Sequence, residues 1–179
     1  QGMVRMRMSS DGGTVDLAGP TDCSIGSADD RDAIIGRLGP DPLRRDAKPA
    51  DALARLRKSA QPIGALLLDQ KVLAGVGNVY RAEALFVNGI NPARPGKACT
   101  DEELSAVWDT VVTMLRKGVK DNRIITIDRK RFPVPKGQAR RGDTTYVYHR
   151  DVCLLCGTPV RTVELGGRAC YYCPTCQPR

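Results

Sequence analysis

The chain has 179 residues, of which 41% are apolar and only 4% aromatic, enough for one ordinary core or two small ones built mostly from aliphatic side chains. No run approaches the about 18 consecutive apolar residues of a membrane-spanning helix, and the N-terminus lacks a secretion signal, so we expect a cytoplasmic protein with no membrane partner. The net charge is +8, and residues 49–179 hold 21 basic against 12 acidic side chains. This excess favours a polyanion such as nucleic acid as binding partner, and a basic surface that only keeps the protein soluble is the alternative.

The opening stretch "QGMVRMRMSSDGGTVDLAGP" predicts a β-hairpin in which Val4, Met6 and Met8 share one face and "SDGG" forms the turn. A lone hairpin is marginally stable in water. We therefore expect these strands to be the tail of a sheet whose earlier strands are missing, and the chain to be a fragment of a longer protein. The stretch "GPTDCSIGSADDRDAIIGRLGPDPL", rich in Gly, Pro and Asp, is typical of a connector, so residues 1–38 are assigned to a truncated β-domain and its linker.

Residues 39–125 predict a helical domain. "PADALARLRKS" places its apolar residues at helical spacing. Two further helical segments flank "LAGVGN"; the first has Pro62 near its start, and the second is expected to begin at Asn78, a good N-cap, and to end near Gly89.

The strongest helix signal is "TDEELSAVWDTVVTMLRKGVKD", where Thr100 and Glu103 form a capping box. Trp108 lies on its apolar stripe and is predicted to be core rather than a binding residue. The stripe consists of Leu104, Val107, Trp108, Val111 and Leu115.

Residues 126–143 break the helical pattern and are predicted to form a basic loop. Within them, "RKRFPVPKGQARRG" holds six basic residues, two prolines and no acid. Such a charge run is more often a solvated loop than a functional element. Residues 144–179 begin with the strand-like "TTYVYHRD" and continue into a cluster of cysteines.

The cysteines follow the pattern Cys153-x2-Cys156-x16-Cys173-x2-Cys176. Two C-x-x-C pairs at this separation are typical of one tetrahedral zinc site, because each short loop presents two thiolates to the metal. Cys170 is three residues from Cys173 on a predicted strand, where side chains alternate, so the two sulfurs diverge and Cys170 is expected to be a bystander. Four thiolates close the coordination shell, which predicts one structural Zn²⁺ and no catalytic metal.

Two other roles for the cysteines agree less well with the sequence. Disulfides are disfavoured because the chain has an odd number of cysteines, seven, and no export signal. A redox C-x-x-C needs only one pair, usually beside a helix start, whereas these two pairs lie beside strand-like segments.

The segments "PVRTVEL" and "RACYY" predict a hairpin with Gly166 and Gly167 at its turn and Arg168 beside the tip, where a guanidinium can reach a phosphate. Gly75 and Gly77 precede the helix expected at Asn78, and glycines allow close backbone approach while a helix N-terminus attracts an anion. A tight turn between helices also requires glycine, so that alternative stays open.

The segments "LLLDQKVLAGVGNVYRAEALF" and "YVYHRD…CxxC…GGRACYYCPTCQ" resemble the helix-two-turn-helix motif and the C-terminal zinc finger of the formamidopyrimidine-DNA glycosylase and endonuclease VIII family. "VRMRM…DLAGPTDC" and "RLGPDPL" resemble the end of that family's N-terminal β-sandwich and its linker. The expected fold is therefore mainly α with small β elements: a β-sandwich remnant, a helix-two-turn-helix domain and a four-cysteine zinc hairpin. "VYHRD" and "RACYYCPTCQ" favour the endonuclease VIII branch.

The resemblance implies a monomeric bacterial enzyme of base excision repair at the nucleoid, which binds damaged double-stranded DNA, removes an oxidised base and cleaves the abasic site. It implies that Asn78 and Arg168 grip phosphates flanking the lesion, and that Tyr148 and Arg150 contact the backbone nearby. The family's catalytic proline, glutamate and lysine have no counterparts in this chain, so no residue here is expected to be catalytic, and Glu83 is expected to be structural. A non-catalytic zinc-ribbon module that binds nucleic acid is the alternative, and a redox protein is a third.

Overall fold

The structure is a computed structural model that describes residues 3–20, 23–133 and 142–179. The chain divides into two compact units, Gln1–Arg37 and Leu38–Arg179, each of which is described by itself. Residues 134–141, which are part of the predicted basic loop, lie outside the described residues. In the part of the chain that is described, no helix is both long enough and apolar enough to cross a lipid bilayer.

The first unit contains the predicted hairpin. Strands β1 (Val4–Ser10) and β2 (Gly13–Ala18) pair antiparallel, and every residue in them is exposed. Met6 lies opposite Leu17 and Met8 opposite Val15, which places these apolar side chains on one face. Among the described residues no further strand pairs with this hairpin.

The predicted connector contains a helix, α1 (Ala28–Ile35), which the composition of the stretch did not suggest. Its start is fixed by a capping box, because the Asp30 amide donates to the Ser27 hydroxyl at 3.2 Å and the Ser27 amide donates to the Asp30 carboxylate at 2.8 Å. None of its residues is buried. Local capping therefore accounts for this helix without a packed face.

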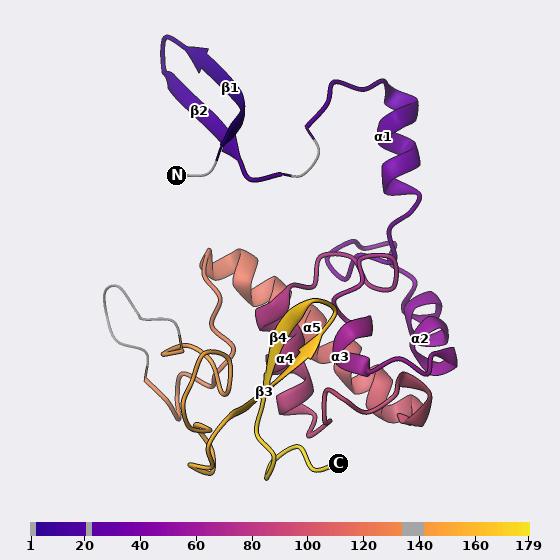
Figure 1. Ribbon diagram of the computed structural model, residues 1–179, viewed down its shortest axis with the longest axis vertical. Helices are drawn as coiled ribbons and strands as arrows, with labels where there is room; N and C mark the ends of the chain where they lie inside the picture. The colour runs from indigo at the N-terminus through magenta and orange to yellow at the C-terminus, as the bar shows by residue number, and fades with distance from the viewer. Residues whose placement is uncertain (1–2, 21–22, 134–141) are drawn as a thin grey trace. The chain divides into compact units, whose positions relative to one another are not determined.

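The second unit is a helical domain with a C-terminal hairpin (Figure 1). Its elements are α2 (Pro49–Lys58), α3 (Ile63–Leu66), α4 (Asn78–Val87), the 3-10 helix η1 (Gly96–Ala98), α5 (Asp101–Asp121), β3 (Arg161–Leu165) and β4 (Arg168–Tyr172). The capping box of Thr100 and Glu103 is confirmed at the start of α5. The first helical segment beside "LAGVGN" is short, since α3 has four residues.

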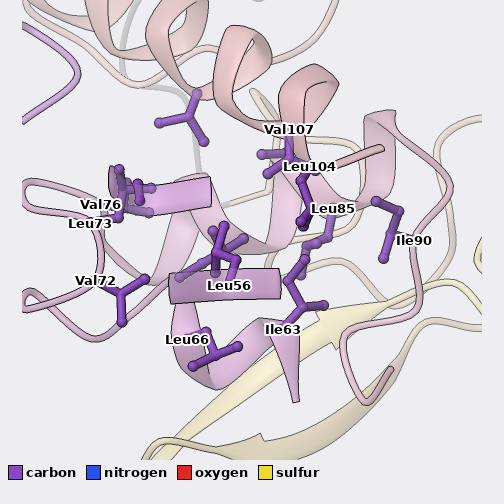
Figure 2. Close-up of a cluster of buried hydrophobic side chains, with 14 of the residues drawn as sticks. Leu56, Ile63, Leu66, Val72, Leu73, Val76, Leu85, Ile90, Leu104 and Val107 are labelled. Carbon is purple, nitrogen blue, oxygen red and sulfur yellow. The ribbon is translucent and has the colours of Figure 1, made fainter. Parts of the chain in front are cut away.

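The core of this unit is aliphatic, as the composition predicted. Leu56 of α2, Ile63 of α3, Leu85 of α4 and Leu104 of α5 meet at its centre (Figure 2). Four residues of the predicted apolar stripe of α5 are buried in this core: Leu104, Val107, Val111 and Leu115. Trp108 is half-buried and packs against the same cluster. These contacts fix α4, the helix that carries the candidate site.

Candidate nucleic-acid interface and metal centre

The predicted zinc ligands come together. The sulfur atoms of Cys153, Cys156, Cys173 and Cys176 all lie within 4.8 Å of one another. Cys156 is 3.5 Å from both Cys173 and Cys176, and Cys153 is 3.9 Å from Cys176. Tetrahedral zinc with Zn–S bonds of about 2.3 Å holds its thiolates about 3.8 Å apart, so this donor set fits a structural zinc ion.

The environment of these thiols also suits a cation. The hydroxyl and the amide of Thr158 lower the pKa of Cys156 to about 6. Burial raises the pKa of Cys153, and burial together with the neighbouring thiols raises the pKa of Cys176. Four clustered thiolates repel one another unless a metal dication neutralises them.

Cys170 lies outside the cluster, as predicted. It is fully buried in β4 and packs with Ala82 of α4 and Leu165 of β3. Burial raises the pKa of its thiol to about 11, so the group stays neutral and packs as a small apolar side chain.

The predicted hairpin ends in two glycines. Gly166 and Gly167 have φ angles of 62° and 70°, and two successive positive φ values are those of the tight turn that matches strand twist. Arg168 follows this turn, is exposed, and makes no side-chain hydrogen bond or ion pair among the described residues. Because Arg168 and the buried Cys170 are two residues apart on β4, the Arg168 side chain lies on the face of the hairpin that packs on α4.

Asn78 begins α4 beside this hairpin, but the helix cap itself is Gly77. The Asn78 side chain makes no capping bond; its Nδ2 donates to the carbonyl of Ala169 at 3.0 Å, and its Oδ1 accepts from Arg81 Nε at 2.8 Å. The structure therefore brings Asn78 next to the residue that follows Arg168, although 91 positions separate it from Ala169.

The turn before α4 has two glycines with different roles. Gly75 has φ +82°, a region that glycine adopts without strain. Gly77 has ordinary extended angles, φ −104° and ψ −178°, and a Cβ added there meets nothing within 4 Å. Gln70 fixes the turn between them, since its Oε1 accepts from the Gly75 amide at 2.8 Å and its Nε2 donates to the Val76 carbonyl at 3.0 Å.

Two charged residues of α4 are fully buried, and the role of Arg81 could not be predicted from the sequence. Its guanidinium donates to the carbonyls of Gly64 and Leu165, each at 2.8 Å, and to that of Arg168 at 3.0 Å, besides its bond to Asn78. Burial lowers the pKa of this guanidinium, which nevertheless remains charged.

The second buried charge, Glu83, has the structural role that the sequence predicted. Its carboxylate accepts from the amides of Tyr146 at 2.7 Å and of Val147 and Tyr148 at 2.9 Å, and from the Thr126 hydroxyl at 2.5 Å. Burial raises the pKa of Glu83, and these four hydrogen bonds oppose the rise. Glu83 thus holds the loop that leads to the first zinc knuckle.

Tyr148 and Arg150 lie in this loop. The Tyr148 ring packs edge-on against His149, at 4.7 Å between centroids, and against Tyr171 of β4, at 5.0 Å. Arg150 Nη1 donates to the Gly142 carbonyl at 2.7 Å, so part of its guanidinium already braces the loop.

Gln177 is a further buried residue whose role the sequence did not predict. Its Oε1 accepts from the Cys173 amide at 2.9 Å, and its Nε2 donates to the Ile90 carbonyl at 2.8 Å. It therefore ties the second zinc knuckle to the segment that follows α4.

The second unit thus combines a helical domain with a glycine turn and a hairpin with a four-cysteine zinc site, and each of these two parts matches a known family of domains. The formamidopyrimidine-DNA glycosylase H2TH domain family matches residues 38–129, and the zinc finger found in FPG and IleRS matches residues 150–179. The chain belongs to the formamidopyrimidine-DNA glycosylase and endonuclease VIII family.

Individual relatives agree with this assignment. Endonuclease 8 1 of Mycobacterium tuberculosis is 44% identical over 180 residues, which cover 98% of this chain and 66% of that protein. Formamidopyrimidine-DNA glycosylase of Thermosynechococcus vestitus is 33% identical over 162 residues, covering 89% of this chain and 55% of that protein. The chain therefore spans 55% to 66% of the length of these two curated relatives.

Solved structures show the same fold. The crystal structure of MutM (Fpg) from Thermus thermophilus matches with a TM-score of 0.76 at 32% identity, covering 97% of this chain and 68% of that one. Lactococcus lactis Fpg in complex with DNA that contains an abasic site matches with a TM-score of 0.67 at 23% identity, covering 83% and 55% of the two chains, a likeness that shows the fold alone.

Proposed function

We propose that this chain is the DNA-binding C-terminal part of a DNA glycosylase and abasic-site lyase, which excises oxidised bases in base excision repair. The observation that carries the proposal is the meeting of Asn78 with the start of β4, which brings an amide to the same side of the hairpin as the Arg168 guanidinium, a group with no partner among the described residues. Both groups donate hydrogen bonds, and the phosphates of a DNA backbone accept them. Asn78 and Arg168 are therefore the proposed grip on the phosphates beside a lesion.

Further features of the turn support an anion at this place. The first amides of α4 have no partner within the helix, and a helix N-terminus carries partial positive charge. Gly77 needs no glycine for its own backbone angles, and its missing side chain leaves space for a close approach. In this proposal Gly75 shapes the turn and Gly77 admits the backbone of the DNA.

Tyr148 and Arg150 are proposed as secondary contacts with the DNA backbone, which contribute less to binding than Asn78 and Arg168. Arg150 shares its guanidinium with the Gly142 and Thr145 carbonyls, so only part of it is free to meet a phosphate. The backbone amide of Tyr148 donates a hydrogen bond to the Glu83 carboxylate, and this bond helps to fix the ring beside His149.

The chemical step is proposed to use groups outside these 179 residues. A glycosylase must rotate the damaged base out of the duplex, because a stacked base hides the bond that is cleaved. The relatives are longer than this chain, which leaves room for a domain with the catalytic amine and the lesion pocket. The exposed apolar face of the β1–β2 hairpin supports our proposal that it ends a β-sandwich.

The endonuclease VIII branch is preferred. The identity of 44% to Endonuclease 8 1 of Mycobacterium tuberculosis exceeds the 33% to the Thermosynechococcus vestitus formamidopyrimidine-DNA glycosylase. The full protein is proposed to act as a monomer in the bacterial cytoplasm, at the nucleoid.

The DNA-binding proposal is tested by fluorescence anisotropy with a duplex that contains a tetrahydrofuran abasic analogue and with an intact duplex. We expect preference for the abasic duplex, and a loss of about tenfold in affinity for Arg168→Ala and for Asn78→Ala, since a hydrogen bond to a charged group is worth about 1.5–3 kcal/mol. Arg116→Ala removes the same charge from an exposed site on α5 and is the matched control. Equal binding to both duplexes favours a zinc-ribbon module without lesion recognition.

The catalytic proposal is tested by borohydride trapping on abasic DNA. A Schiff base requires an amine positioned at the sugar carbon. We expect no covalent adduct with this chain, and efficient trapping would show that the catalytic amine lies within it.

A further inference from the structure

The contacts of Asn78 determine which way its amide faces. Arg81 Nε carries a hydrogen and can only donate, so the Asn78 atom 2.8 Å away is the oxygen. The Ala169 carbonyl can only accept, so the atom 3.0 Å from it is the nitrogen. The two contacts select the same orientation, and they leave the second N–H of the Asn78 amide without a partner among the described residues.

Arg81 also holds the tip of the hairpin. Two of its hydrogen bonds go to the carbonyls of Leu165 and Arg168, which face each other across the turn and close it. A third goes to Gly64 in α3. The Arg81 side chain on α4 thus contacts the turn of the hairpin, the side-chain oxygen of Asn78 and helix α3.

This arrangement uses both the shape and the charge of arginine. Arg81 has 0% of its surface exposed, and no carboxylate pairs with it in the residues that the structure describes. A planar guanidinium can direct its N–H groups to several fixed acceptors at once, whereas a lysine ammonium is a compact point charge. In the part of the chain that the structure describes, the hydrogen-bond partners of this positive charge are all carbonyl oxygens, and they include those of Asn78 and Arg168.

We propose that Arg81 is the positioning residue of the phosphate grip: it turns the Asn78 amide so that a donor faces the DNA, and it locks the strand that carries Arg168 to α4. This inference rests on the proposed DNA-binding function, in which Asn78 and Arg168 meet the backbone. Without Arg81 the Asn78 amide keeps only its bond to the Ala169 carbonyl, so its orientation is less firmly fixed and its oxygen can turn toward the phosphate.

The test compares the affinities of four variants for the tetrahydrofuran duplex: Arg81→Lys, Asn78→Ala, the double variant and Arg57→Lys. Arg57 is an exposed arginine that pairs with Asp101, and its replacement is the matched control. We expect Arg81→Lys to lower affinity about tenfold although the charge is kept. We expect the loss in the double variant to be smaller than the product of the two single losses, because both changes remove the Arg81–Asn78 bond. Wild-type affinity in a folded Arg81→Lys variant, or losses that multiply, would overturn the proposal.

A second readout keeps the proposal separate from protein stability and from the proposed function. In nitrogen-15 NMR of the unaltered chain without DNA, we expect the Arg81 Nε–H to exchange slowly with water, and Asn78→Ala to accelerate that exchange. A rapidly exchanging Nε–H, or one that Asn78→Ala leaves unchanged, overturns the positioning role even if Arg81→Lys fails to fold. Failure of the unaltered chain to bind the duplex, with the NMR result as expected, would instead refute the DNA-binding function.

Discussion

Replacement of Glu83 by glutamine tests how the loop before the first zinc knuckle is held. The carboxylate accepts from three amides and one hydroxyl, all at 2.5–2.9 Å, and it is fully buried. Glutamine has nearly the same shape but offers one oxygen and one NH₂ group in place of two oxygens. Glu83→Gln therefore changes the hydrogen bonds of the loop without creating a cavity.

The expected cost follows from the donors that remain. With its NH₂ group toward Thr126, the amide can donate to the hydroxyl, which keeps its own bond to the Thr144 carbonyl at 3.2 Å. The Tyr146 amide is then left buried without an acceptor. An unsatisfied buried donor costs about 1–3 kcal/mol, so we expect the free energy of unfolding to fall by about 2 kcal/mol and the melting temperature by about 6 °C.

Thermal unfolding and hydrogen exchange together provide the assay. We expect the amides of residues 146–148 to exchange faster in Glu83→Gln, while the zinc content stays at that of the unaltered chain. Glu102→Gln changes an exposed carboxylate on α5 and serves as the control. A loss of less than about 0.5 kcal/mol with unchanged exchange would refute the reasoning, since it would mean that no amide loses its acceptor.

Three further outcomes are expected. Cys176→Ser should lower zinc content and the melting temperature, whereas Cys170→Ser should leave zinc content unchanged, as measured by metal analysis and calorimetry. Gly75→Ala should cost about 1 kcal/mol of stability because of its positive φ, whereas Gly77→Ala should keep the stability and weaken binding to the abasic duplex in the anisotropy assay. A neighbouring guanidinium lowers the pKa of Glu103, so its contribution to stability is present above the ordinary glutamate pKa and is lost as the pH falls through the lowered value; Glu103→Gln should flatten this part of an acid titration.

The sequence predicted the zinc site because its ligands lie in two short segments whose geometry is local. Each C-x-x-C pair forms its own knuckle, and strand alternation alone separates Cys170 from Cys173. The capping box of α5 could also be predicted from local sequence. The capping box of Ser27 at the start of α1 was not predicted, because the composition of that stretch suggested a connector.

The parts that the sequence did not predict depend on tertiary contacts. Arg81 looks like an ordinary surface charge of a helix. Glu83 was expected to be structural, but nothing in the spacing of the two residues indicates that both are buried. Their partners are backbone groups far along the chain, and backbone groups have no signal in the sequence. The approach of Asn78 to β4 and the burial of Gln177 depend on long-range packing in the same way.

The C-terminal hairpin is held at both of its ends, by the metal site at its base and by hydrogen bonds from α4 at its turn. The zinc thiolates hold the base, and the Arg81 guanidinium holds the turn, with strands β3 and β4 between them. Loss of the metal therefore loosens the base of the hairpin, while its turn stays hydrogen-bonded to Arg81 of α4. If the hairpin binds DNA as proposed, we expect removal of zinc to weaken that binding gradually, because the turn beside Arg168 stays attached to α4 while the base of the hairpin is no longer held.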